Sequence, residues 1–162
     1  MKKIIRILTL ITLVATLVAS LASCDVLAGP TVAGEQVTVV IEERDGSYTT
    51  YEIALADVAD KSMGAYSLLA HLRDKKGLAL DAPDSSFGIY LNAVGNLIPD
   101  LTKNEYVSIY TSVERDFSVP TADFPIVNEV VYNGITLKTA GVGISSMSVE
   151  DGTVILIRIE TY

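Results

Sequence analysis

Residues 153–160 read T-V-I-L-I-R-I-E, and this stretch decides the fold. Val154 to Ile157 are apolar at every position, without the alternation that is typical of a half-exposed strand. A strand that is apolar on both faces lies inside a sheet, where other elements cover it from both sides. The pair Asp151–Gly152 just before it predicts a turn. We therefore expect the chain to end on a central strand, covered by a helix on one face and by another element on the other.

The beginning of the domain predicts a β-hairpin. Residues 37–42, V-T-V-V-I-E, place Val37, Val39 and Ile41 on one face of a strand. The Asp45–Gly46 pair is a strong signal for a tight turn, and residues 48–55 alternate again as the returning strand.

One helix follows the hairpin. Residues 65–76 carry apolar side chains at helical spacing: Ala65, Leu68, Leu69 and Leu72. Ser62 is the expected N-cap, and Gly77 suits the left-handed residue that ends a helix. This is the main helix that the sequence predicts after the N-terminal segment.

The remainder of the chain predicts strands and turns. Residues 87–94 and 105–113 alternate apolar and polar side chains, and residues 129–138 form a hairpin with Asn133–Gly134 at its tip. This order of hairpin, helix, further strands and apolar final strand predicts an α+β domain. It is the order of a β-grasp-like fold, in which a single mixed sheet packs on one main helix and the first and last strands lie side by side and parallel.

The N-terminus predicts export. Residues 1–6 carry three positive charges, residues 7–22 carry no charge, and residues 21–24 read L-A-S-C. This ending resembles the signal of bacterial lipoproteins, which implies cleavage before Cys24, a lipid on its thiol and a palmitate-type anchor in the membrane. A plain signal peptide with a chance cysteine, or an uncleaved anchor helix, are the alternatives.

The lipoprotein interpretation divides the chain and places it. It predicts an N-terminal signal helix, the signal peptide, over 1–23. A lipidated cysteine and flexible tether would follow over 24–36, and the folded domain over 37–162. The protein would then lie at the cell membrane with its domain on the extracytoplasmic side. Several acyl methylenes buried together hold such an anchor firmly, since each contributes about 0.8 kcal/mol.

The charge of the mature chain excludes some partners. Removal of residues 1–23 leaves nine Lys and Arg against 20 Asp and Glu, a net charge of −11. Nucleic-acid phosphates would be repelled, and so would anionic lipid headgroups. Acylation of Cys24, the only cysteine, would also leave no thiol for catalysis, a disulfide or a metal site.

One internal segment carries a family resemblance. Residues 85–97, S-S-F-G-I-Y-L-N-A-V-G-N-L, together with the V-T-V-x-I opening and the Asp-Gly turns, resemble the transcobalamin C-terminal-like domains of exported bacterial proteins. The resemblance implies the same fold over 37–162 and raises a corrinoid-like small molecule as a ligand. The chain has no tryptophan, which departs from the Gly-Trp element of that family and from its flat-ligand contact.

The sequence shows no catalytic set. His71 is the only histidine, and no serine or acidic partner stands at a recognisable spacing from it. The acidic groups at 42–45, 81–84 and 114–116 lack the spacing of a calcium loop and suit solvated turns. We therefore expect no catalytic residue, no metal site and no cofactor.

Tyrosines give the stronger indication of a binding surface. The expected ligand-binding residues are Tyr90, Asn92, Tyr110, Ser112, Tyr132 and Asn133. Tyr106 shares the strand face of Tyr110, and rings interleaved with small polar groups can form a shallow site. Ordinary cross-strand aromatic pairing is the alternative. The sequence thus predicts a non-catalytic ligand-binding module, with a structural or protein-interaction module of the cell envelope as the alternative function.

Overall fold

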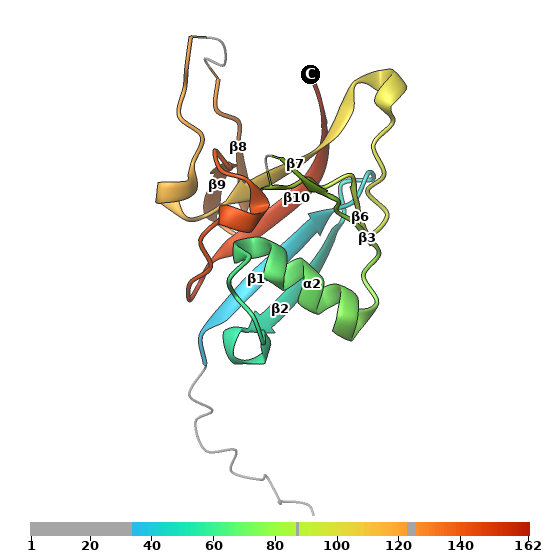
Figure 1. The fold of residues 1–162 in the computed structure, drawn as a ribbon. Coiled ribbons are helices and arrows are strands. Elements are labelled where there is room, and N and C mark those ends of the chain that lie inside the picture. The colour runs from blue at the N-terminus through green and yellow to red at the C-terminus, as the bar shows by residue number, and fades with distance from the viewer. Residues whose placement is uncertain (1–33, 87, 123–125) are drawn as a thin grey trace, which may run out of the picture. The chain divides into compact units, whose positions relative to one another are not determined.

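The computed structural model describes residues 34–86, 88–122 and 126–162. The expected signal peptide and Cys24 lie outside these residues. Gly34–Tyr162 form one compact unit, drawn in Figure 1. Within the described residues, no helix has the length and apolar character needed to cross a membrane.

The unit is built on a six-stranded sheet in the order β2-β1-β10-β7-β9-β8. Its strands are β1 (Gln36–Glu42), β2 (Tyr48–Ala54), β7 (Glu105–Thr111), β8 (Glu129–Tyr132), β9 (Ile135–Thr139) and β10 (Val154–Thr161). β1 and β10 are parallel, with Ile41 opposite Ile157, and all other neighbours are antiparallel. The predictions of an α+β domain, a mixed sheet and a parallel pairing of the first and last strands are therefore confirmed.

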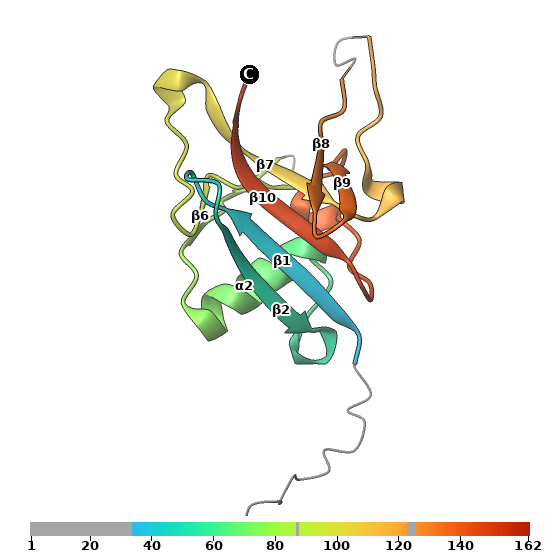
Figure 2. The same cartoon turned by 180° about the vertical axis from the view of Figure 1, so that it is seen from behind.

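The α-helix of the described chain, α2 (Gly64–Lys76), covers one face of this sheet (Figures 1 and 2). Its apolar stripe packs against the buried side chains of β1 and β10 in the larger of two hydrophobic cores. The helix and these two strands contribute the following core residues: Val37, Val39, Ile41, Leu68, Leu69, Leu72, Ile155 and Ile157. The helix ends as predicted, because Gly77 is left-handed and its N–H donates to the carbonyls of Leu72 and Arg73.

The predicted start of the helix is wrong. Ser62 does not cap α2, since its N–H donates to Asp60 Oδ1 in the preceding turn and Met63 holds the cap position. Gly64 begins the helix with φ of +51°, and a Cβ there would lie 2.5 Å from the Met147 carbonyl oxygen. Close contact with a neighbouring loop, rather than a side-chain cap, therefore fixes this end.

The β8–β9 hairpin covers the opposite face of the sheet. The smaller core there consists of Val40, Tyr110, Tyr132, Leu137, Val154 and Leu156. The Tyr132 hydroxyl lies 2.8 Å from Thr50 Oγ1, and its ring lies edge-on to Tyr48 at 5.3 Å. Since Tyr132 and Thr50 belong to the first and last strands of the sheet order, the sheet curls until its two edges meet. The expected cover on both faces of the final strand is confirmed.

The predicted strand over 87–94 is interrupted. Its place is taken by the short pairs β3 (Leu80–Asp81) with β6 (Ala93–Val94), and β4 (Asp84–Ser85) with β5 (Gly88–Ile89). Gly88, in β5, has φ of +94°, and Gly95, just after β6, has φ of +59°, so the backbone turns at both positions and does not run on as one regular strand. The 3₁₀ turns are η1 (Leu55–Asp57), η2 (Leu101–Lys103), η3 (Glu114–Asp116) and η4 (Ile144–Ser146).

Candidate ligand-binding site

β7 extends beyond its neighbour β9. β10 pairs with β7 along its whole length, from Thr111 to Glu105, whereas β9 pairs only with Tyr110 and Thr111. Residues 105–109 of β7 therefore form an edge without a neighbouring strand, which we call the free edge; its two ends bond loop residues through the Glu105 N–H and the Ile109 carbonyl. An edge strand presents unpaired N–H and C=O groups along its open side.

The direction of the backbone groups on this edge follows from its hydrogen bonds. The Ser112 N–H donates to the Val154 carbonyl at 3.0 Å, so the even-numbered residues of β7 face β10. The odd-numbered residues face outwards: the Glu105 N–H donates to Asp100 O, and Ile109 O accepts from the Ala140 N–H. Between these bonds, the carbonyl of Glu105, both groups of Val107 and the N–H of Ile109 have no partner within the described residues.

A groove runs along this free edge. It consists of two adjoining hollows of about 300 Å³ and 230 Å³, which share Tyr90, Leu91, Tyr106 and Val107. The first continues over Asn92, Ile98, Pro99 and Leu101, and the second over Ile109, Val142 and Ile144. We call the two together the aromatic groove.

The aromatic groove exposes large apolar side chains. Tyr90 is 58% exposed, Ile98 66% and Leu101 80%. Isolated exposed apolar residues are ordinary, but a contiguous group around a hollow indicates an interaction site. Tyrosine adds a large surface and a hydroxyl that can bond a polar ligand group.

The Tyr106 ring is held in place by the neighbouring strand β10, on which Glu160 lies directly opposite it. Its hydroxyl donates to Glu160 Oε2 at 3.2 Å, and the Tyr110 hydroxyl donates to Oε1 of the same carboxylate. The Arg158 Nε also donates to Oε1 at 3.1 Å. The Glu160 carboxylate therefore fixes one wall of the groove, because it accepts a hydrogen bond from Tyr106.

These contacts shift the pKa values of the cluster. Burial raises the pKa of Glu160, but the hydrogen bonds from Tyr110 and Tyr106 and the charge of Arg158 outweigh it, and the net pKa lies below the usual value. Burial and the Glu160 carboxylate raise the pKa of Tyr110 to about 12. Glu160 is thus ionised and both tyrosines are protonated donors at neutral pH.

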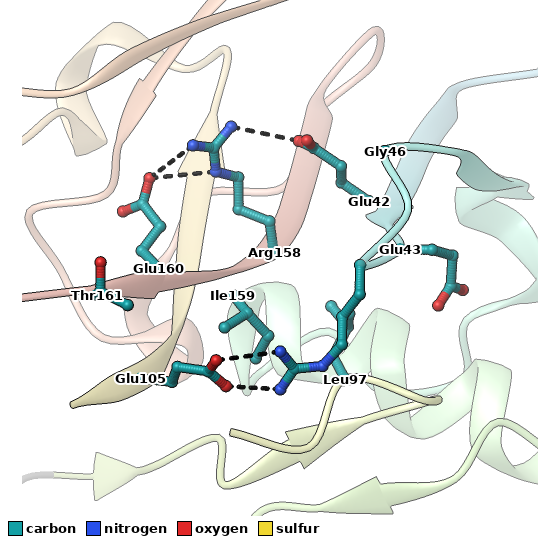
Figure 3. A pocket seen from close by; sticks show the side chains of 10 residues that line it. Glu42, Glu43, Gly46, Leu97, Glu105, Arg158, Ile159, Glu160 and Thr161 are labelled. Atoms are coloured by element: carbon teal, nitrogen blue, oxygen red, sulfur yellow. Dashed lines mark hydrogen bonds and ion pairs between the residues drawn. The ribbon is translucent and has the colours of Figure 1, made fainter. Parts of the chain in front are cut away.

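A charged cleft of about 320 Å³ lies between the C-terminal end of β10 and the turn after β1 (Figure 3). Arg44, on the turn after β1, bonds Glu105 at 2.6 Å, and its guanidinium donates to the Ile98 carbonyl at 2.6 Å. Arg158 bridges Glu160 and Glu42. The Arg44 hydrogen bond lowers the pKa of Glu105, so this pair is ionised at neutral pH. It fastens the loop that carries Ile98 to the first hairpin and so supports the wall of the aromatic groove.

The structure places only part of the predicted ligand set in this groove. Tyr90 and Asn92 line it, and they retain the alternating exposure that the sequence indicated. Tyr110 is buried under the β8–β9 hairpin, and Ser112 Oγ accepts the Val154 N–H. Tyr132 is buried in the smaller core, and Asn133 is the left-handed residue at the hairpin tip. The six residues therefore do not form one site.

Sequence reasoning missed Arg44, Glu105, Arg158 and Glu160. The sequence did carry a signal for two of them. Arg158 and Glu160 follow the apolar run two positions apart, so they lie on the same face of the strand. The Arg44–Glu105 pair joins residues 61 positions apart, and no local pattern indicates it.

The remaining sequence candidates carry no chemistry that we can assign. His71 lies on α2, at a separate hollow that it shares with Asp57, Asp74 and Lys75. Within the described residues there is no group of three or more His, Cys, Asp or Glu side chains that could hold a metal ion.

No protein-family model matches the chain, and no curated protein matches it. Solved structures do. One is a protein from Ruminococcus gnavus described as a candidate metal-binding protein, with a TM-score of 0.50 and 14% identity, covering 79% of this chain and 98% of that one. Another is haptocorrin in complex with Cbi, with a TM-score of 0.50 and 12% identity, covering 86% of this chain and 29% of that one. At these identities the likeness is one of fold, so the domain shares its architecture with a part of haptocorrin and with nearly all of the R. gnavus protein.

Proposed function

We propose that the protein is a non-catalytic ligand-binding module whose site is the aromatic groove. The observation that carries the proposal is the cluster of exposed Tyr90, Ile98 and Leu101 around a hollow beside a free strand edge. The fold order, with the parallel pair β1–β10 beside α2, supports a β-grasp-like description. No catalytic role is assigned to any residue.

A corrinoid-like small molecule is the first ligand to test. The resemblance of residues 85–97 to transcobalamin C-terminal-like domains supports it, and residues 89–93 of that segment line the groove. The likeness in fold to haptocorrin, solved with Cbi, supports it as well. Tyr90 and Tyr106 would supply the aromatic surface that the missing tryptophan provides in the family.

Titration of the soluble domain with cobalamin tests this ligand. The chain has 8 Tyr and no Trp, so tyrosine emission, quenched by an absorbing corrinoid nearby, reports binding directly. We expect saturable quenching, weakened about fivefold by Tyr90→Ala, because one aromatic contact contributes on the order of 1 kcal/mol. The matched control is Tyr66→Ala, whose ring lies at the separate hollow on α2. Equal affinity in both variants, or no quenching up to about 1 mM, would contradict the proposal.

We also propose that the module is a lipoprotein of the cell membrane, tethered through Cys24 by the segment before β1, with its domain on the extracytoplasmic side. The expected tether over 24–36 is shortened at its end, because Glu35 and Gln36 are already bonded to the folded domain. The L-A-S-C ending at 21–24 supports this location. Mass spectrometry of the protein from membranes is expected to find a chain that begins at an acylated Cys24. The same preparation from Cys24→Ser should appear in the soluble fraction or retain its signal peptide. A mature chain that begins elsewhere, with a free thiol, would refute the anchor.

A protein-interaction module is the second candidate function. The specific observation in its favour is the unpaired backbone of β7 at Val107, because small-molecule sites have no need of a free strand edge. Apolar side chains beside such an edge would otherwise be an aggregation hazard.

A further inference from the structure

We infer that the free edge of β7, from Glu105 to Ile109, binds an extended peptide segment of a partner protein, which adds to the sheet as a further strand. The inference rests on the second proposed function, the protein-interaction module, and names the partner's chemistry. The occupant is a strand with small apolar side chains at alternate positions and basic residues at its ends.

The first argument is the backbone. Val107 offers an N–H and a carbonyl to the groove, with the Glu105 carbonyl before them and the Ile109 N–H after them. This alternation of acceptors and donors is the pattern that one edge of an antiparallel partner satisfies. Residues 89–93 form the opposite wall of the groove, but the N–H groups of Tyr90 and Asn92 donate to the carbonyls of Pro83 and Asp81 and not to β7. The slot between the two walls is therefore available to an added strand.

The second argument is a contrast between the exposed edges of the paired strands β7 and β10. β10 also extends beyond its neighbour, since its pairing with β1 ends at Ile157, and its free end faces the charged cleft. That edge is guarded by the Arg44–Glu105 ion pair and by Arg158. Figure 3 shows Arg158 between Glu42 and Glu160 in this cleft. Charged side chains at an edge prevent pairing with other chains. On the β7 edge the same pair protects only the first residue, Glu105. Residues 106–109 carry no charge and are flanked by exposed apolar side chains, so this part of β7 is the edge that accepts a partner.

The third argument is charge. Among the described residues, the charged side chains that line the aromatic groove are Asp81 and Glu105, and none is basic. Glu105 is paired with Arg44, so Asp81 is the carboxylate there that carries no ion pair among the described residues. From residue 34 onwards the chain has nine Lys and Arg against 19 Asp and Glu, a net charge of −10. A second copy of this domain would carry the same excess and be repelled. A segment with basic ends is attracted instead, and its side chains alternate between the groove wall and solvent with the period of a strand.

The free protein already allows a test of the geometry. Amide hydrogen exchange measured by NMR should show Val107 and Ile109 exchanging at least tenfold faster than Ser108 and Tyr110, whose N–H groups face β10. Equal protection of Val107 and Ser108 would show that the edge is closed and would overturn the inference.

Binding is tested with a synthetic peptide of five alternating Val and Thr residues with a Lys pair at each end. We expect saturable binding by isothermal titration, with protection of the Val107 and Ile109 amides in the complex. The control peptide has the same side chains but carries N-methyl groups on the amides of one edge, which removes the donors on that edge. It should bind at least tenfold more weakly if the backbone pairs with β7, and equal binding by the two peptides would overturn the inference.

The protein side of the test uses Val107→Pro against Val107→Ala. Both remove the valine side chain, but only proline removes the outward N–H, and this N–H takes no part in the β10 ladder. We expect at least a tenfold loss of peptide affinity in Val107→Pro relative to Val107→Ala. If Val107→Pro does not fold, the methylated peptide still decides the question. Absence of peptide binding up to about 1 mM overturns this inference, whereas the cobalamin titration above decides the small-molecule function separately.

Discussion

Replacing Leu156 with alanine is expected to lower the free energy of unfolding by about 3 kcal/mol, the middle of the range for a fully buried leucine. Leu156 is completely buried and lies between the sheet and the β8–β9 hairpin, against Tyr110 and Leu137. Truncation removes apolar contacts and leaves a cavity that the curled sheet cannot close, because Tyr132 ties the hairpin to Thr50 on the far strand. Urea unfolding followed by circular dichroism measures the difference.

The control for this experiment is Val131→Ala on the same hairpin. Val131 is 63% exposed, so its truncation should change the free energy of unfolding by less than about 0.5 kcal/mol. If the two variants lost equal stability, the hairpin would not cover β10 in solution and the smaller core would not exist.

Glu160→Gln is the second change with a large expected effect, about 2 kcal/mol at neutral pH. The carboxylate accepts from Tyr106 and Tyr110 and pairs with Arg158, and hydrogen bonds to a charged group contribute more than neutral ones. A glutamine side chain has the same shape, but it removes the negative charge and turns one acceptor into a donor that faces other donors. The loss should appear in urea unfolding at pH 7.

The pH dependence of this difference has a definite sign. The folded pKa of Glu160 lies below its unfolded value of about 4.3, so the unfolded chain binds the proton first. The stabilisation is therefore complete above the unfolded pKa and is lost as the pH falls through the folded pKa. The wild type and Glu160→Gln should converge in stability between about pH 4 and the folded pKa.

Glu129→Gln is the control for the titration, because Glu129 pairs with Lys138 on the exposed hairpin. Its difference from wild type should be within about 0.5 kcal/mol at pH 7, as for other exposed ion pairs. A wild type and Glu160→Gln that kept the same separation down to pH 2 would show that folding does not lower the pKa of this carboxylate. Loss of Tyr106 positioning should also weaken binding in the aromatic groove of Glu160→Gln.

The local elements were predictable because each depends on a short pattern. The left-handed Gly46 and Gly134 follow Asp45 and Asn133 in the two tight turns that the sequence indicated. The prediction of one strand over 87–94 was wrong because it also rested on a short pattern. Alternation alone cannot show that Gly88 and Gly95 bend the chain. Its alternation still reported exposure correctly, with Leu91 buried between the exposed Tyr90 and Asn92.

The site itself was only partly predictable. The period of a strand shows that Tyr106 and Tyr110 share a face, but it does not show what lies against that face. The β8–β9 hairpin covers Tyr110 and stops short of Tyr106, and this depends on how far β9 extends along β7. Tyr110 therefore became part of the core, while Tyr106 became the wall of a groove.

The sequence by itself determined the central place of residues 154–157 in the sheet, because four consecutive apolar side chains cannot face water on either side of a strand. It also determined the helix, the two hairpins and the acidity of the domain. Only the tertiary structure decided which strand edge stayed open and which tyrosines stayed exposed. Those features depend on strand lengths and on pairs such as Arg44 with Glu105, which meet only once β1 and β7 have paired with β10 on either side.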